Sequence, residues 1–86
     1  MKYLIQYKSR FGFCAEIGDE SAVYNLMFNH TCNPDLYSNI AVYRLIDGKN
    51  PERMECVFVA KFDRVYIYDR YKNYIGCYGG LYAQEN

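Results

Sequence analysis

Few residues in this 86-residue chain have the types and spacing that catalysis requires. The single histidine, His30, lies close to Cys32, with Asp35 nearby, and this is the only cluster that could pair a nucleophile with a base. Positions 30 and 32 do not face each other on a helix, and His30 falls on the apolar side of the helix predicted below. We therefore expect no enzyme. A small thiol-dependent enzyme based on His30 and Cys32 ranks third among the functions considered below, after protein binding and nucleic-acid binding.

The carboxylates and cysteines form no ligand set of the kind that a metal requires. Asp19 with Glu20 is expected at a helix start, and Glu52 with Glu55 around a turn, where solvation accounts for both pairs. The four cysteines never show the C-x-x-C spacing of a structural zinc site. No export signal precedes them, so reduced, partly buried thiols are favoured over disulfides. We expect no metal and no cofactor.

Length and composition predict one globular domain over residues 1–86. Hydrophobic residues make up 51% of the chain and aromatic residues 19%, which is far from a disordered composition. Ten Lys and Arg residues balance ten Asp and Glu residues. The chain therefore has neither the basic field of a simple nucleic-acid binder nor the acidity of a nucleic-acid mimic.

The charges are nevertheless sorted along the chain. Residues 1–10 contain bases and no acid, whereas residues 11–43 contain acids and no base. Blocks of this size are usually solvated surfaces that contribute little to stability. The acidic residues at the expected helix start, Glu16, Asp19 and Glu20, are a secondary candidate for binding a basic partner.

Alternating apolar residues predict the strands, and a helical period interrupts them once. The predicted strands cover residues 2–8, 11–17, 39–47, 54–62, 64–69 and 73–78, where 54–62 and 64–69 can form either a hairpin or one long bent strand. Residues 79–86, which begin with two glycines, are expected to form a loose C-terminal tail. The predicted fold is α+β, with an antiparallel sheet of about five strands, one helix on one face, and the order β-β-α-β-β-β.

The predicted helix follows Gly18 and places its apolar side chains along one face: Ala22, Val23, Leu26, Met27 and His30. Asp19 or Ser21 can cap its first turn, and Asn33-Pro34 ends it. One helix of this length cannot cover both faces of the sheet, so half of the sheet is left for water or a partner. We expect the functional surface on that exposed face.

Strand alternation places the tyrosines of the last hairpin. If the aliphatic residues of 64–69 and 73–78 share the core face, Val65 lies opposite Cys77 and Ile67 opposite Ile75. This register puts Tyr68 opposite Tyr74, Tyr66 opposite Gly76 and Tyr78 opposite Arg64. It therefore predicts that Tyr66, Tyr68, Tyr74 and Tyr78 all point away from the helix.

Three roles are open for these exposed tyrosines. Cross-strand tyrosines are common in sheets and can be structural only. They can also bind a protein, because tyrosine and arginine are enriched among interface hot spots. A third role is stacking of single-stranded nucleic acid, but Asp63 and Asp69 offset the nearby cations and no RNA-recognition motif occurs.

We favour a small non-enzymatic protein-binding module, with single-stranded nucleic-acid binding through a Tyr/Arg sheet face as the alternative. Its partner is another protein or protein complex, or a second copy through the tyrosines. No membrane association is expected, because no apolar run approaches membrane-spanning length. The predicted contact residues are Arg64, Tyr66, Tyr68, Arg70, Tyr71, Lys72, Tyr74 and Tyr78.

The small size, the single helix on a strand-rich sheet and the high tyrosine content resemble those of small phage or mobile-element proteins. Some of these are anti-CRISPR and other anti-defence inhibitors. The resemblance is one of type across the whole chain and transfers no site residue. It implies an inhibitor of a host defence complex that acts by steric occlusion, since the acidity of a DNA mimic is absent. The expected location is the cytoplasm, or the host cytoplasm if the chain is phage-encoded.

Overall fold

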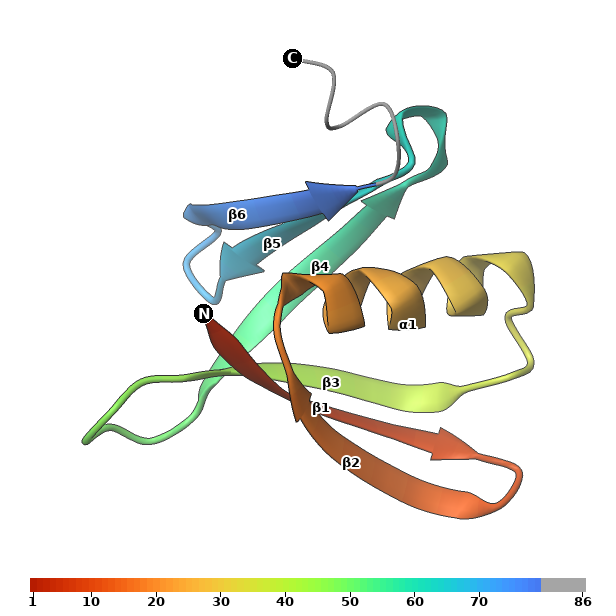
Figure 1. Ribbon diagram of the computed structural model, residues 1–86, viewed down its shortest axis with the longest axis horizontal. Helices are drawn as coiled ribbons and strands as arrows, with labels where there is room; N and C mark the ends of the chain where they lie inside the picture. The colour runs from red at the N-terminus through yellow and green to blue at the C-terminus, as the bar shows by residue number, and fades with distance from the viewer. Residues whose placement is uncertain (80–86) are drawn as a thin grey trace.

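The structure, a computed structural model, describes residues 1–79 and shows one helix packed on a six-stranded antiparallel sheet (Figure 1). The predicted α+β class and the β-β-α-β-β-β order are confirmed, with six strands in place of about five. Along the sheet the strands run β2-β1-β3-β4-β5-β6. The elements are β1 (Lys2–Ser9), β2 (Gly12–Gly18), α1 (Glu20–Cys32), β3 (Ser38–Leu45), β4 (Glu52–Val59), the short 3₁₀ turn η1 (Ala60–Phe62), β5 (Arg64–Asp69) and β6 (Tyr74–Gly79).

The ends of α1 follow the predicted capping signals. The side chain of Asp19 accepts hydrogen bonds from the backbone N–H groups of Ser21 and Ala22 in the first turn of the helix. At the other end, Asn33 is the C-cap, and its N–H donates to the carbonyl of Asn29. Local sequence therefore sets both ends of the helix.

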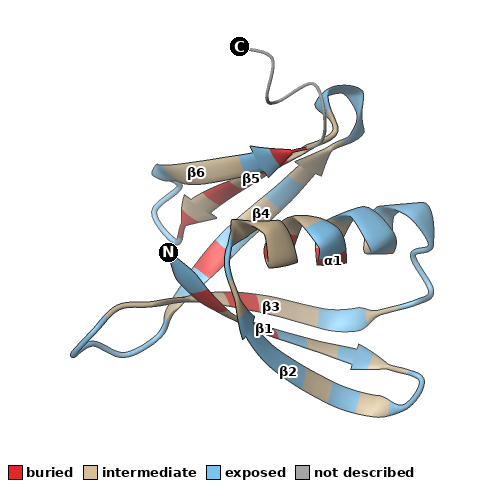
Figure 2. Cartoon of the chain, in the orientation of Figure 1, coloured by how far each residue is buried: buried red, intermediate tan, exposed pale blue. Residues whose placement is uncertain are grey.

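The core lies between α1 and one face of the sheet (Figure 2). Alternate residues of β1, β3, β4 and β5 point toward the helix, which contributes two fully or nearly buried side chains of its own. The buried apolar residues are Tyr3, Ile5, Val23, Leu26, Val42, Met54, Val65 and Ile67. The opposite face of the sheet has no helix over it in the described part of the chain.

The sheet opens between β3 and β4. The two strands pair only over residues 42–44 and 52–54 and then diverge, with α1 lying across the opening (Figure 1). A register shift between Gln6 and Lys8 marks a bulge in β3, where Asn39 adopts a left-handed conformation with φ of 52°. A bulge bends its strand, and Asn tolerates this conformation better than most residues. The bulge lies in the part of β3 that no longer pairs with β4.

Residues 79–86 were predicted to form a loose C-terminal tail. Gly79 still belongs to β6 and is buried. The rest of the predicted tail, residues 80–86, lies outside the described residues.

Candidate functional site

Over β4, β5 and β6, the sheet face opposite α1 carries tyrosine and valine side chains, and we call this part of it the tyrosine face. In β5, Tyr66 and Tyr68 alternate with the buried Val65 and Ile67, so they point away from the helix as predicted. Matching positions on the two neighbouring strands complete the surface. The tyrosine face consists of Glu55, Val57, Val59, Arg64, Tyr66, Tyr68, Tyr74 and Cys77.

Cross-strand pairs arrange this face in rows. Tyr68 lies directly across from Tyr74, and their rings meet edge to face with centroids 6.1 Å apart. This pair was predicted and is confirmed. In the next row, Tyr66 lies between Val57 of β4 and Cys77 of β6. Rings held by cross-strand neighbours form a stiff contact surface, because fewer rotamers remain to be lost on binding.

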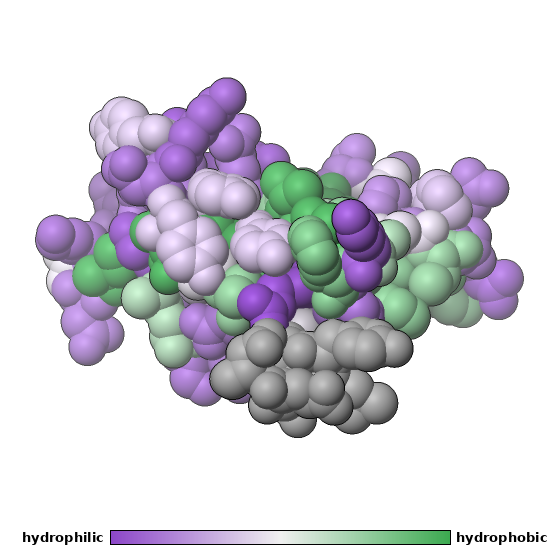
Figure 3. Space-filling model, turned by 90° about the horizontal axis from the view of Figure 1, so that it is seen from above, coloured by the Kyte–Doolittle hydropathy of each residue, from purple (hydrophilic) through white to green (hydrophobic). Residues whose placement is uncertain are grey.

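The tyrosine face is accessible. Tyr74 is 58% exposed and Val57 is 49% exposed, while Tyr66 and Tyr68 are half-buried by their neighbours. Figure 3 views the molecule from the side on which β6 lies, and it shows pale aromatic rings gathered beside green apolar side chains. Val57 and Val59 were missed from the sequence, although the alternation of "MECVFVAKF" with Cys56 and Phe58 inward was a signal for them.

Tyr78 and Cys77 lie on the faces opposite to those predicted. Val65 pairs with Tyr78 and not with Cys77, so Tyr78 shares the helix side of the sheet with Val65. Cys77 pairs with Tyr66 on the tyrosine face, where Gly76 was predicted. The predicted contact between Tyr78 and a cross-strand arginine is therefore wrong.

A β-bulge at Ile75 causes this correction. The pairs Tyr68–Tyr74 and Ile67–Gly76 leave Ile75 as an extra residue in β6, which shifts every later residue by one. Ile75 remains packed against the core. The bulge thus keeps an aliphatic residue inward and turns the larger Tyr78, in place of Cys77, toward the helix.

Tyr78 belongs to an aromatic cluster beneath α1. Its ring centroid lies 5.8 Å from that of Tyr24, which also contacts Phe28 and Phe58. The Tyr24 hydroxyl donates a hydrogen bond to Asp63, and this bond together with burial raises the pKa of Tyr24 to about 12. Tyr78 is therefore placed to hold the helix on the sheet, away from a partner bound to the tyrosine face.

The predicted loop residues lie in the turn between β5 and β6. The buried Asp69 carboxylate accepts hydrogen bonds from the backbone N–H groups of Tyr71 and Asn73 at 2.8 and 2.9 Å. These bonds lower the pKa of Asp69, and the bond from Asn73 has the largest effect. Lys72 adopts a left-handed φ of 68°, and Arg70 donates to the Tyr71 hydroxyl at 2.8 Å. The side chains of Arg70, Tyr71 and Lys72 are exposed and lie in the turn next to the Tyr68–Tyr74 pair.

The tyrosine face is electrically balanced. It carries one cation, Arg64, and one anion, Glu55, which lies directly across from Tyr68. Arg64 donates to the sulfur of Cys77 at 3.7 Å. A hydrogen bond with Cys77, followed by burial, raises the pKa of Tyr74, so its phenol stays neutral at physiological pH. This surface offers apolar area and neutral hydroxyls in place of charge.

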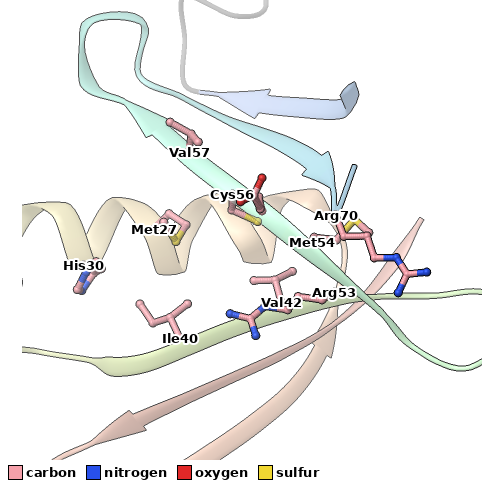
Figure 4. Close-up of a pocket in the computed structure, with 10 residues that line it drawn as sticks. Met27, His30, Ile40, Val42, Arg53, Met54, Cys56, Val57 and Arg70 are labelled. Atoms are coloured by element: carbon pink, nitrogen blue, oxygen red, sulfur yellow. The ribbon is translucent and has the colours of Figure 1, made fainter. Parts of the chain in front are cut away.

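A cleft of about 540 Å³ lies where β3 and β4 diverge (Figure 4). Met27 and His30 of α1 line it together with Ile40 of β3 and Cys56 of β4. Burial raises the pKa of the Cys56 thiol to about 11, which keeps the thiol protonated. His30 Nδ1 is buried and, within residues 1–79, has no hydrogen-bond partner.

The two residues proposed for thiol chemistry lie in different surroundings. His30 faces the cleft, whereas Cys32, the last residue of α1, is exposed. No hydrogen bond joins them in the described chain. The geometry therefore gives the His30–Cys32 alternative no direct contact between nucleophile and base.

The secondary acidic candidates flank the junction of β2 and α1. Asp19 is exposed and serves as the helix cap, and its hydrogen bond from the Ser21 hydroxyl is the main cause of its lowered pKa. Glu20 accepts from the Tyr3 hydroxyl and lies 3.9 Å from the N-terminal amine. Glu16 is exposed and projects from the helix side of β2, opposite Ile5.

Within residues 1–79, no helix is long and apolar enough to cross a membrane. The same residues contain no group of three or more His, Cys, Asp or Glu side chains that could hold a metal ion. Comparisons with protein-family models, curated proteins and solved structures find no match.

Proposed function

We propose that this chain is a small non-enzymatic protein-binding module whose contact surface is the tyrosine face. One observation supports the proposal: the sheet face without a helix presents closely paired, exposed aromatic and aliphatic side chains, led by Tyr74 at 58% and Val57 at 49% exposure. Tyrosine offers large apolar area, a hydroxyl for hydrogen bonding and little entropy to lose. The residues proposed to contact the partner are Arg64, Tyr66, Tyr68, Arg70, Tyr71, Lys72 and Tyr74, joined by Val57 and Val59.

The charge balance favours a protein over single-stranded nucleic acid. Bases can stack on tyrosines, but the phosphates of the strand need several cations along its path. The tyrosine face has Arg64, with Glu55 in the adjacent row; Arg53 follows Glu55 on the same side of β4, where it lies over the ring of Tyr43, and Arg70 and Lys72 lie in the turn. A partner protein needs no such charge, because apolar burial and hydroxyl contacts can supply the affinity.

A narrower role follows from the resemblance in type to small phage and mobile-element proteins. The chain would act as an inhibitor that covers a functional site on a host defence complex, in the manner of anti-CRISPR proteins. This role requires only a rigid binding surface and no catalytic group. It also places the chain in the cytoplasm of the cell in which the complex works.

The proposal is tested by affinity capture from a lysate of the source cells, followed by mass spectrometry and measurement of the dissociation constant for the captured protein. The double substitution Tyr68→Ala and Tyr74→Ala should weaken binding by at least about 2 kcal/mol. Leu36→Ala is the matched control, since Leu36 is 40% exposed and lies between α1 and β3. Full binding by the double variant would place the contact surface elsewhere.

The nucleic-acid alternative is tested with labelled single-stranded DNA and RNA at increasing salt. Binding by several phosphate contacts should fall by orders of magnitude between low and physiological salt. Under our proposal the oligonucleotides bind weakly, and Tyr68→Ala with Tyr74→Ala leaves that weak binding unchanged. Tight, salt-sensitive binding that the double variant abolishes would contradict the proposal.

A further inference from the structure

β2 is an edge strand whose outer side pairs with no other strand in the described sheet. It lies at the lower edge of the sheet in Figure 1. Edge strands are usually protected from further pairing by Lys, Pro or a bulge. Between Gly12 and Gly18 there is no Lys, Pro or bulge, Glu16 is the one charged residue, and the pairing of β2 with β1 runs without a register shift. The outer N–H and C=O groups of β2 are therefore in a regular strand that can accept another.

The side chains of β2 add apolar surface to this open edge. Phe13 is 78% exposed and Ile17 is 64% exposed, and both lie with Ala15 on the sheet face away from α1. Large apolar side chains exposed on an unprotected edge are typical of a surface that pairs with another strand.

The sequence around β2 indicates what that strand is, because it is complementary to itself about Ala15. When a second copy of β2 is placed antiparallel with a two-fold axis at Ala15, Phe13 lies opposite Ile17 of the second copy. Gly12 then lies opposite Gly18 of the second copy. The axis is perpendicular to the sheet, so equivalent faces stay on the same side and the apolar residues meet.

The charges beyond the strand ends are also complementary. Arg10 lies in the turn just before β2, and Asp19 and Glu20 lie just after its end, so the same symmetry brings the basic turn of one copy near the acidic helix start of the other. Arg10 and Asp19 are exposed, and no salt bridge of the described chain involves either of them. Since the contact occurs twice, the basic turn between β1 and β2 of each copy meets the acidic helix start of the other.

The symmetry also avoids repulsion. Glu16 lies opposite Cys14 of the second copy, so like charges do not face each other. A shift of the axis by one residue, to Glu16, would place the two Glu16 carboxylates opposite one another. A shift to Cys14 would place Phe13 opposite Ala15 of the second copy and leave Ile17 opposite Phe11, which lies before the start of β2. The pattern thus selects the axis at Ala15.

We propose that two copies of this chain pair through β2 about a two-fold axis at Ala15, joining two six-stranded sheets into one. This dimer is independent of the proposed function, because β2 lies at one edge of the sheet and the tyrosine face covers β4, β5 and β6 near the other. Both tyrosine faces would lie on the same side of the joined sheet. The dimer would therefore present two binding surfaces to a partner.

Molar mass measured by light scattering across micromolar concentrations provides the first test. The native chain should form a dimer, and Ile17→Lys should raise the dimer dissociation constant by about tenfold or more, since two lysines enter the apolar contact. Val57→Lys, at a comparably exposed position on β4, should leave the dimer intact. Circular dichroism checks that both variants remain folded. A monomeric native chain, or a dimer that Ile17→Lys leaves unchanged, would overturn the proposal.

Disulfide trapping tests the position of the axis, in a background with Cys14→Ser and Cys32→Ser. Ala15→Cys should form a covalent dimer on oxidation, because the two introduced thiols face each other. Phe13→Cys is the control: its two copies would be about 13 Å apart along the strands, at about 3.3 Å per residue, beyond the reach of a disulfide. Equal cross-linking of both variants, or preferential Cys14–Cys14 cross-linking in the native chain, would contradict an axis at Ala15. Loss of the dimer in the double variant Tyr68→Ala and Tyr74→Ala would show that the two copies meet through the tyrosine face and not through β2.

Discussion

The ring of Tyr78 packs against the ring of Tyr24 on α1, with centroids 5.8 Å apart and planes at 58°. Tyr74, earlier in the same strand, points to the other side of the sheet and pairs with Tyr68. Two tyrosines of one short strand thus differ in role, since one packs the helix onto the sheet and the other is available for binding. The bulge at Ile75 separates these roles.

This division predicts different effects of two matched substitutions. Tyr78→Ala should lower the free energy of unfolding by about 2 kcal/mol, because the ring, although 40% exposed, packs against Tyr24 and this aromatic contact is lost with its buried area. Tyr74→Ala should lower it by less than about 1 kcal/mol, since only an exposed cross-strand pair is lost. Urea unfolding monitored by circular dichroism measures both values. Equal losses would show that Tyr78 contributes no more to the fold than an exposed tyrosine.

The turn that follows β5 predicts a stability loss in acid. Hydrogen bonds from Asn73 and Tyr71 hold the pKa of Asp69 below its ordinary value of 3.8. A lowered folded-state pKa stabilises the fold above the unfolded-state pKa, and this contribution disappears as the pH falls through the folded-state value. Stability should therefore fall below pH about 4, and Asp69→Asn should reduce this dependence. Thermal unfolding between pH 2 and 7, about the range over which carboxylates titrate, measures how stability depends on pH. Asp35→Asn, at an exposed position, is the control. An unchanged acid dependence in Asp69→Asn would show that Asp69 is not the group responsible.

The cysteines should differ in reactivity. Cys32 is exposed, whereas Cys56 is half-buried in the cleft and has a pKa raised to about 11 by burial. Because the thiolate is the reactive species, iodoacetamide at mildly alkaline pH should modify Cys32 first and Cys56 last. Peptide mass spectrometry over time gives the order. If Cys56 in the folded chain reacts as fast as Cys32, it is not buried as described. Loss of an activity when Cys32 is modified would favour the thiol-enzyme alternative.

Local patterns in the sequence determined much of this protein. The period of two in "RVYIYD" was enough to place Tyr66 and Tyr68 away from the helix, because successive side chains of a strand always point to opposite faces. The start of α1, with Asp19 or Ser21 as its cap, and its end at Asn33-Pro34 were predictable because these residues act on their own neighbouring backbone. The element order and the α+β class were predictable for the same reason.

Only the tertiary structure decided how the elements meet. Whether Cys77 or Tyr78 faces the helix depends on the bulge at Ile75, and a tyrosine ring packed against Tyr24 offers more apolar contact than a thiol, although Tyr78 stays 40% exposed. That gain exists only when Tyr24 stands over β6, and these residues are far apart in sequence. The strand order and the divergence of β3 from β4 likewise depend on packing between distant segments. Alternation within single strands therefore located Arg64, Tyr66, Tyr68 and Tyr74, while the rest of the tyrosine face was set by contacts that no local pattern contains.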